Sequence, residues 1–171
     1  CILYPVSRIP YLVSCYLCIM LKSTLIKATV AGAYQLKHFF NGEFKISNKE
    51  GMNNLVTEAD HAAEKAIIEV IREEYPDHFI LSEETGEMRT NSEFKWIIDP
   101  IDGTVNFANG IPLCCVSIGL EKQGEMLLGC VYNPIMDEFW MNVFRVMVRM
   151  NIDVGFALHG YDIYRFWMLD K

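Results

Sequence analysis

Basic residues are scarce in this chain. Only 15 of its 171 residues are Lys or Arg, against 22 Asp and Glu, and the net charge is −7. No basic stripe is present that would displace counterions from a nucleic acid, so the sequence argues against a nucleic-acid-binding protein. A small phosphorylated substrate is not excluded, because bound Mg²⁺ would reverse the local sign of the charge.

Internal repeats and low-complexity segments are also missing from the sequence. Hydrophobic residues make up 51% of the chain, which permits a buried core and argues against disorder. A length of 171 residues is enough for one domain of ordinary size. The composition therefore predicts a globular protein with a single main core.

The six cysteines do not suggest a disulfide framework. Cys114 and Cys115 are neighbours in an apparent strand, so their side chains point to opposite faces. That arrangement suits buried free thiols, and we expect a reducing, cytoplasmic compartment. Cys15 and Cys18 form an isolated C-x-x-C in an apolar run without a second pair nearby, so a metal or redox role is not expected there.

The N-terminal segment is apolar and long enough to suggest a membrane span. Pro5 and Pro10 are expected to interrupt a helix, Arg8 lies inside the stretch, and the basic lead-in of a secretory signal is missing. We interpret residues 1–19 as an extraneous or apolar leader, with regular structure beginning at Met20. A membrane anchor is the alternative to this interpretation.

Apolar spacing and turn residues predict the following elements. A helix is expected from Met20 to Phe40, and a loop or mobile hairpin over residues 43–54. A second helix is expected from Thr57, its N-cap, to about Tyr75, with Asp60 at the capping-box position. Strands are expected at 79–81, 95–98, 113–121 and 126–132, with a polar loop at 85–94 and a further strand near 139–140. The last two long strands are separated by Lys122-Gln123-Gly124-Glu125, which indicates an antiparallel hairpin. Residues 141–171 receive no assignment.

The most informative motif is Asp99-Pro100-Ile101-Asp102-Gly103-Thr104. It follows the apolar run 96–98, which is typical of a strand end, and precedes 105–107, which begins a short helix. Two carboxylates at a strand end can converge on a metal, and a Gly-Thr pair at a helix start offers backbone N–H groups to an anion. The motif therefore predicts a metal-dependent phosphoryl site.

Two further acidic residues occupy the ends of expected elements. Glu83 follows one strand, and Asp60 lies at the start of the second helix. Two Mg²⁺ ions could share Asp99, hold phosphate oxygens and lower the pKa of a water, which Thr104 and Asp60 would orient and deprotonate. Taken singly these residues are ordinary, since Glu83 with its acidic neighbour is typical of a solvated loop. The hypothesis depends on their conjunction.

Two other classes of site share parts of this pattern. Haloacid-dehalogenase phosphatases place Asp-x-Asp-Gly-Thr after a strand, with the first Asp as nucleophile. Here two residues, Pro100 and Ile101, separate the aspartates, which disfavours that class. A calcium-binding loop is also disfavoured, because Ile101 falls where a ligand is expected.

Three segments in order resemble the inositol monophosphatase family: LVTEAD at 55–60, SEE at 82–84 and WIIDPIDGTVNF at 96–107. The strands within 112–134 are similar as well. The resemblance implies an α/β (α+β) layered sandwich of the α-β-α-β-α type, of which residues 20–140 would form the N-terminal domain. That part would hold a mostly antiparallel sheet and two N-terminal helices. The resemblance also implies hydrolysis of a phosphate monoester, most simply inositol monophosphate, with two or three Mg²⁺ ions.

The resemblance assigns roles to individual residues. Glu83, Asp99, the Ile101 carbonyl and Asp102 would be metal ligands, with Asp99 bridging two ions. Gly103 and Thr104 would bind phosphate through their amides. Thr104 and Asp60, together with Glu83, would act on the nucleophilic water, and Lys49 would lie on a mobile loop. The family usually has Gly where Ser82 stands.

One family signature is missing from the sequence. No Trp-Asp pair, whose aspartate would complete the second metal site, is present, and 141–171 do not match the family. Asp153, Asp162 and Asp170 are only weak candidates to replace that aspartate. We therefore expect a truncated, weakly active hydrolase, or alternatively a non-catalytic relative or binding module.

The substrate and the partners follow from the resemblance alone. Relatives also act on histidinol phosphate, fructose bisphosphate or phosphoadenosine nucleotides, and the sequence after the motif favours the inositol branch. A homodimer is expected for full-length members of the family. Neither a nucleic acid nor a membrane is expected as a partner.

Overall fold

The computed structural model describes residues 9–40 and 49–143, and the side chains of 17–40 and 58–142. Four groups of predictions lie outside the described residues. These are residues 1–8 of the N-terminal leader, residues 43–48 of the predicted loop, and the unassigned segment from 144 onward. The fourth group is the three candidate replacement ligands Asp153, Asp162 and Asp170.

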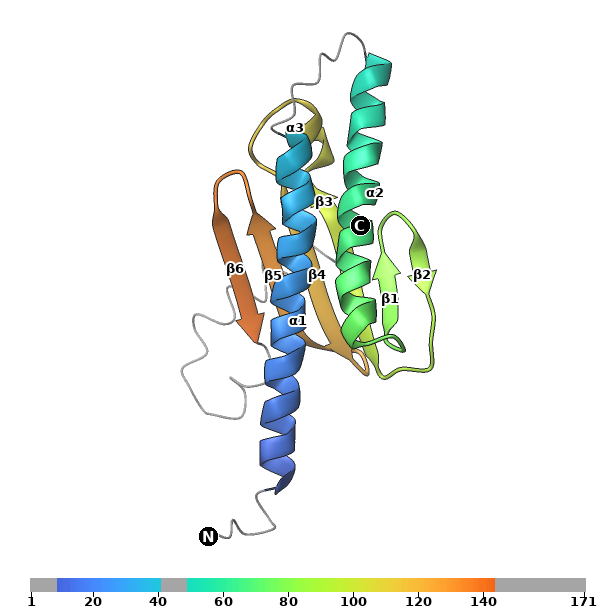
Figure 1. The fold of residues 1–171 in the computed structure, drawn as a ribbon, viewed down its shortest axis with the longest axis vertical. Helices are drawn as coiled ribbons and strands as arrows, with labels where there is room; N and C mark the ends of the chain where they lie inside the picture. Colours follow the sequence, from blue (N-terminus) through green and yellow to red (C-terminus); the bar gives the residue numbers. More distant parts are fainter. Residues whose placement is uncertain (1–8, 41–48, 144–171) are drawn as a thin grey trace.

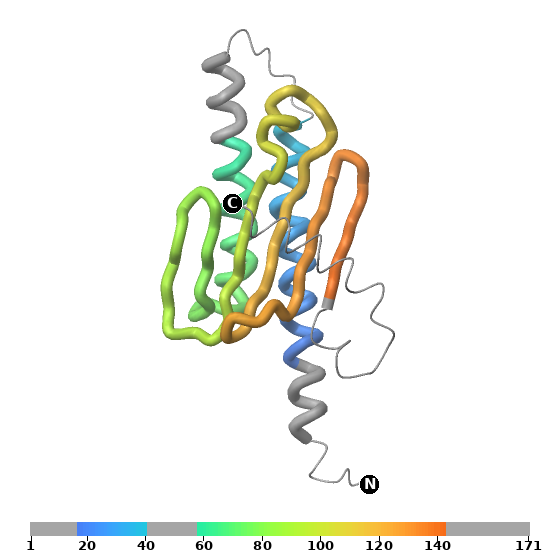
Figure 2. The backbone as a smooth tube through the Cα atoms, turned by 180° about the vertical axis from the view of Figure 1, so that it is seen from behind, coloured from blue at the N-terminus to red at the C-terminus, as the bar shows by residue number. Residues whose placement is uncertain are grey.

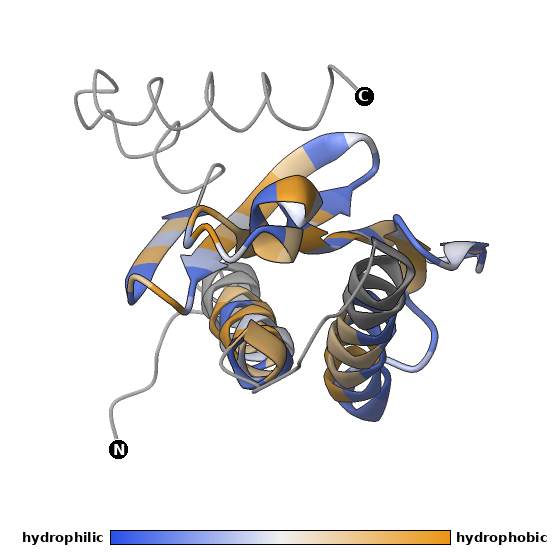
Figure 3. Cartoon of the chain, turned by 90° about the horizontal axis from the view of Figure 1, so that it is seen from above, coloured by the Kyte–Doolittle hydropathy of each residue, from blue (hydrophilic) through white to orange (hydrophobic). Residues whose placement is uncertain are grey.

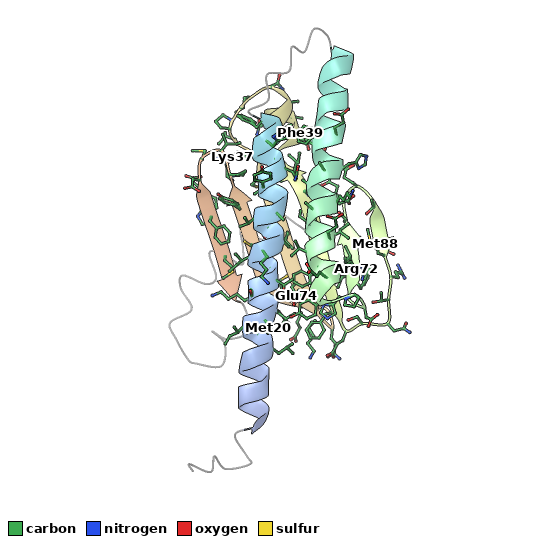
Figure 4. The ribbon with its side chains drawn as sticks, in the orientation of Figure 1. Met20, Lys37, Phe39, Arg72, Glu74 and Met88 are labelled. Carbon is green, nitrogen blue, oxygen red and sulfur yellow. The ribbon has the colours of Figure 1, made fainter. Side chains whose placement is uncertain are left out.

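Two long helices cover one face of a six-stranded sheet (Figures 1 and 3). Helix α1 spans Ile9–Phe40 and α2 spans Lys49–Glu74. The two helices pack against each other, α1 also contacts β4 and β5, and α2 contacts β3. An ion pair between Lys27 of α1 and Glu74 of α2, at 3.3 Å, joins them near the C-terminal end of α2 (Figure 4).

The starts of both helices differ from the prediction. Helix α1 begins at Ile9, and Pro10 lies in its first turn instead of interrupting it. The missing N–H of proline has no intrahelical partner there, so proline is tolerated. Helix α2 begins at Lys49, so Lys49 is not on a loop and Thr57 is not an N-cap. Once a helix has formed, adding residues of modest propensity costs less than about 1 kcal/mol each, and the helix continues past Thr57 in the N-terminal direction.

The sheet is mostly antiparallel, as predicted (Figure 2). Its strands run in the order β2-β1-β3-β4-β5-β6. Among the described strands, β1 and β3 are the only pair that runs in parallel. Their bounds are β1 Phe79–Ser82, β2 Gly86–Met88, β3 Phe94–Asp102, β4 Cys115–Lys122, β5 Glu125–Asn133 and β6 Glu138–Val143.

Most predicted strands are confirmed, with three differences, one being that β4 begins at Cys115, so Cys114 is not in the strand as predicted. The segment expected to be a polar loop contains the short strand β2, and β3 continues through the acidic motif to Asp102. The predicted hairpin joins β4 to β5, and Gln123 and Gly124 at its tip have φ values of 52° and 85°. Positive φ at both central residues is the geometry of the tight hairpin turn that the sequence indicates.

The core has two parts. The larger cluster lies between the helices and the sheet and includes Leu25 of α1, Ile67 of α2 and Trp96 of β3, all fully buried. The smaller cluster lies where the acidic motif ends and includes Leu36, Ala59, Ile101, Phe107 and Cys114. Helix α3, Thr104–Ala108, rests on this second cluster through Phe107, as the expected short helix after the motif.

Part of α1 resembles a membrane span in length and composition. The stretch Leu17–Phe40 passes that test, but it lies near the N-terminus and 39% of its most apolar window is buried in the protein. Leu21 and Leu25 belong to the main core cluster. Part of the apolar surface of α1 is therefore buried in the core, and its support for a membrane anchor is weak.

A second polar contact organises the end of the sheet away from the motif. Arg72, in the last turn of α2 (Figure 4), donates to the His78 carbonyl at 2.7 Å. The His78 ring stacks between Tyr75 and Phe94, with ring centroids 4.5 and 4.8 Å away. Its Nδ1 accepts a hydrogen bond of 3.0 Å from Nε1 of the buried Trp96.

Candidate active site

The predicted acidic residues lie where the parallel strands β1 and β3 end. The backbone N–H of Glu83, directly after β1, donates to the Ile98 carbonyl at 3.1 Å. This bond continues the parallel ladder, in which Ser82 pairs with Ile98. Because the carboxyl ends of parallel strands lie at one edge of a sheet, Glu83 is placed beside Asp99.

A bulge in β3 sets the relation between the two aspartates of the motif. Asp99 pairs with Ser117 and Asp102 pairs with Cys115, so three steps along β3 match two along β4. One extra residue in a strand is the definition of a β-bulge, and a bulge accommodates the missing N–H of Pro100. Ser117 and Cys115 are two residues apart and share a face, so Asp99 and Asp102 share that face too.

The thiol of Cys115 interacts with both aspartates of the motif. Its Sγ donates to Oδ2 of Asp102 at 3.8 Å. Burial raises the pKa of Cys115, and the charges of Asp102 and Asp99 raise it further. Cys114 is buried, and burial raises the pKa of its thiol to about 11. Cys18, Cys114, Cys115 and Cys130 are free thiols; of the two expected to be buried, Cys114 is buried and Cys115 is half-buried.

Glycine is required at position 103. Gly103 caps the N-terminus of α3 with φ 82° and ψ 38°, in the left-handed region. A Cβ added there would lie 2.6 Å from the Leu113 carbonyl oxygen. Among the described residues no side chain caps α3, so its first N–H groups have no side-chain partner at the N-cap.

Thr104 and Ile101 are directly linked. The Thr104 hydroxyl donates to the Ile101 carbonyl at 3.1 Å, which is the oxygen predicted to be a backbone metal ligand. The Ile101 side chain is 2% exposed in the smaller core cluster. Apolar packing thus holds the centre of the motif, while Thr104 is exposed.

Asp60 is a buried acid with a strongly shifted pKa. It lies on α2 with 6% of its surface exposed. Burial raises its pKa to about 7, with further contributions from the charges of Glu84, Glu83 and Glu64. The charges that act on Asp60 include that of Glu83, and a pKa near 7 suits a general base at neutral pH.

Glu64 is a buried carboxylate of α2 that the sequence analysis did not single out. Its side chain is 3% exposed, and Oε1 accepts from both the N–H and the hydroxyl of Thr85, at 3.0 and 3.1 Å. Its position four residues after Asp60, on the same face of an amphipathic helix, was the only available signal.

The structure brings together some of the predicted residues and leaves others apart. The charge of Glu83 acts on Asp60, Glu83 adjoins Asp99, and Thr104 contacts Ile101. Within the described part of the chain, no three His, Cys, Asp or Glu side chains are close enough to hold one ion together. Lys49 begins α2, and its side chain is not among those described.

The chemistry of the donor set fits a hard cation. The available groups are carboxylates and a carbonyl, the oxygen ligands that Mg²⁺ prefers. Oδ1 of Asp99 is buried, and the mutual repulsion that raises the pKa of Asp60 is the kind that a bound cation relieves. The residues present therefore fit Mg²⁺ in kind, although the described side chains do not form a complete coordination set by themselves.

Comparison with known proteins gives the family. The family model described as the inositol monophosphatase family matches residues 21–146. The chain therefore belongs to the inositol monophosphatase family, which is a metal-dependent phosphatase family. The fold class predicted from the resemblance is confirmed, since the solved structures that match are of this family and of SuhB.

Several relatives are similar over the same part of the chain. The Nus factor SuhB of Haemophilus influenzae is 42% identical over 125 residues, covering 72% of this chain and 47% of that protein. The inositol-1-monophosphatase of Synechocystis is 42% identical over 115 residues, covering 67% and 40%. The structure of the Bartonella henselae extragenic suppressor protein SuhB aligns with a TM-score of 0.64 at 32% identity, covering 72% and 48%. The chain thus spans about half the length of the relatives it matches.

Proposed function

We propose that this chain carries the metal and phosphate half of a Mg²⁺-dependent phosphomonoesterase site. The observation that supports the proposal most is the bulge that puts Asp99 and Asp102 on one face of the sheet, next to the turn that carries Glu83. The substrate we propose is an inositol monophosphate, since the curated relatives include an inositol-1-monophosphatase.

Each residue has a proposed role. Glu83, Asp99, Asp102 and the Ile101 carbonyl would hold Mg²⁺, two or three ions in the full site. Bound Mg²⁺ would neutralise phosphate oxygens and lower the pKa of an attacking water. The backbone N–H groups of Gly103 and Thr104 would bind the phosphate.

The attacking water would be handled by Thr104 and Asp60. The Thr104 hydroxyl already donates to the Ile101 carbonyl, so its oxygen is left to accept from the water. The pKa of Asp60, raised to about 7, lets its carboxylate take the proton. Glu83, on the turn beside Asp60, would hold the metal next to that water.

The proposed activity of this chain is weak. The sequence contains no Trp-Asp pair, so the aspartate that would complete the second metal site is not supplied by that motif. With one carboxylate fewer, the affinity for the second ion should fall. Cytoplasmic localisation and a homodimeric full-length relative belong to the same proposal.

A non-catalytic role is the second candidate. The favouring observation is that the described residues do not assemble three metal-binding side chains. Several relatives bear the name Nus factor and not the name of an enzyme. A binding module that retains the fold would keep the core and lose the metal.

Titration with Mn²⁺, followed by electron paramagnetic resonance, separates the two candidates. We expect the 171-residue chain to bind Mn²⁺, and Asp99→Asn to weaken binding at least about tenfold because a charged ligand is lost. Asp137→Asn, in the turn between β5 and β6, is the matched control and should leave the affinity unchanged. A chain that binds no Mn²⁺, or an affinity indifferent to Asp99→Asn, contradicts the proposal.

A further inference from the structure

Glu64 is a buried carboxylate to which the family resemblance gives no role. Acidic side chains are almost never buried to this extent unless they are paired. Among the described residues its partner is Thr85, whose N–H and hydroxyl both donate to Oε1 of Glu64. Two bonds from one residue to one oxygen fix the position of Thr85 against α2 more tightly than one bond would.

Thr85 ends the turn that carries Glu83. The turn connects β1 to β2, whose register pairs Ser82 with Gly86. At the start of this turn, the Glu83 N–H is bonded to the Ile98 carbonyl of β3. The turn is therefore attached at both ends, to β3 at Glu83 and to α2 at Thr85.

The attachment to α2 matters because of where Asp60 lies. Residues four apart on a helix are neighbours on one face, so Glu64 and Asp60 lie one above the other on α2. The negative charges of Glu83 and Glu84 lie close enough to act on Asp60. Repulsion between these carboxylates works to separate the turn from the helix, and the two bonds to Thr85 oppose that separation.

We propose that Glu64 is a positioning residue, which through Thr85 holds Glu83 at the place where it ligates the metal. This inference rests on the proposed function and extends it by one residue pair. Hydrogen bonds that orient a metal ligand from behind typically change metal affinity by about 10- to 100-fold when they are removed.

The first test is Mn²⁺ affinity of the full chain and its variants. Glu64→Ala removes both bonds and should weaken Mn²⁺ binding by about 10- to 100-fold. Glu64→Gln keeps a carbonyl oxygen that accepts from Thr85, so it should restore the affinity to within about threefold of wild type. Thr85→Val removes only the hydrogen bond of the hydroxyl. Its Mn²⁺ affinity should lie between those of Glu64→Ala and Glu64→Gln.

Two controls separate positioning from general destabilisation. Ile67→Val shortens a fully buried side chain on the same helix and should lower the thermal midpoint without changing Mn²⁺ affinity. Glu69→Ala removes an exposed carboxylate of α2 that pairs with Lys65, and should change neither quantity.

The second test needs no metal, and it also applies if Glu64→Ala fails to fold. Amide hydrogen exchange in the metal-free chain should show that the backbone N–H of residue 85 is protected in wild type and in Thr85→Val. In Glu64→Ala, where that variant folds, the same N–H should be at least about tenfold less protected. An unprotected Thr85 amide in the wild-type chain contradicts the inference.

The outcomes distinguish the inference from the function on which it rests. A wild-type chain that binds no Mn²⁺ contradicts the proposed function and, with it, the positioning of a metal ligand. A wild-type chain that binds Mn²⁺ with an affinity unchanged by Glu64→Ala or by Thr85→Val contradicts the inference alone. A Glu64→Gln variant that binds Mn²⁺ as weakly as Glu64→Ala also contradicts the inference, because the charge of Glu64 and not its hydrogen bonds would then determine the affinity.

Discussion

Asp99 and Asp102 lie on the same face of the sheet although two residues stand between them. A regular strand would send residues three apart to opposite faces, and the extra residue in β3 corrects this. The left-handed Gly103 then turns the chain directly into α3. Bulge and glycine together keep both carboxylates beside the start of a helix.

The first prediction concerns Gly103. Replacing it with Ala should destabilise the fold, because φ is 82° and the new Cβ would lie 2.6 Å from the Leu113 carbonyl oxygen. Gly124→Ala is the matched control, since its φ is also positive but a Cβ there has open space. The control should cost about 1–2 kcal/mol, and Gly103→Ala about 1–3 kcal/mol more. If Gly103→Ala and Gly124→Ala have equal free energies of unfolding in urea, the close approach of a Cβ at position 103 to the Leu113 carbonyl oxygen is refuted.

The second prediction concerns Asp60 in metal-free protein. The carboxyl has an ordinary pKa of 3.8 and a folded-state pKa of about 7. The folded state therefore binds the proton more tightly, so this contribution to stability is complete below pH 3.8 and is lost as pH rises through 7. At pH 8 Asp60→Asn should be more stable than wild type by roughly 2–4 kcal/mol, with little difference below pH 4.

The measurement is urea unfolding in EDTA at several pH values. Asp77→Asn, beyond the end of α2 and exposed, serves as the control and should show no such trend. A wild-type chain whose stability relative to Asp60→Asn does not fall between pH 4 and 8 would show that burial and the neighbouring carboxylates do not raise the pKa of Asp60.

The third prediction concerns His78. Burial lowers its pKa, and the charge of Arg72 lowers it further, while Asp77 acts in the opposite sense. The neutral ring accepts from Trp96, which protonation of Nδ1 would prevent. The unfolded state binds the proton more tightly than the folded state does. The contribution of His78 to the free energy of unfolding is therefore fully present above about pH 6.5, and it falls as pH drops below that value.

The check compares stability at pH 8 and pH 5.5. His78→Phe keeps a flat ring between Tyr75 and Phe94 but does not titrate, so it should show a smaller loss at low pH than wild type does. His61→Gln, on the exposed face of α2, is the control and should behave as wild type. If wild type and His78→Phe lose the same free energy of unfolding between pH 8 and pH 5.5, the role given to His78 is contradicted.

The fourth prediction concerns Ser82, which stands where the family usually has Gly. Its side chain is 3% exposed, and among the residues that the structure describes its hydroxyl has no hydrogen-bond partner. Ser82→Ala removes that hydroxyl and should stabilise the protein by about 1 kcal/mol. Thr29→Val, which removes a hydroxyl bonded to the Leu25 carbonyl at 2.9 Å, should not stabilise it. A loss of stability in Ser82→Ala, read from thermal unfolding, would mean that the hydroxyl is satisfied.

Local patterns in the sequence sufficed for much of the fold. The β4–β5 hairpin follows from its turn residues, and α3 follows from the Gly-Thr start after a strand. The start of α2 was wrong because Thr57 is a good N-cap in isolation, whereas the helix extends upstream of it. Strand β2 was missed because three residues carry too little alternation to stand out in a polar segment.

The candidate site was only partly predictable. Spacing identified Asp99 and Asp102 but could not reveal the bulge, since register depends on the pairing with β4. The contact between Glu64 and Thr85 joins residues 21 positions apart and has no local signature. Roles for Glu83, Gly103 and Thr104 rest on the family resemblance and on the proposal made above.

The most direct test of the central claim is Mg²⁺-dependent release of phosphate from inositol 1-phosphate by the 171-residue chain. It should be compared with Asp99→Asn and with a full-length relative under the same conditions. We expect a rate above that of Asp99→Asn but at least about 100-fold below the relative, because no Trp-Asp pair within the 171 residues supplies the aspartate proposed to complete the second metal site. A rate no greater than that of Asp99→Asn would contradict the assignment of the site, and a rate within tenfold of the relative would contradict the need for the missing aspartate.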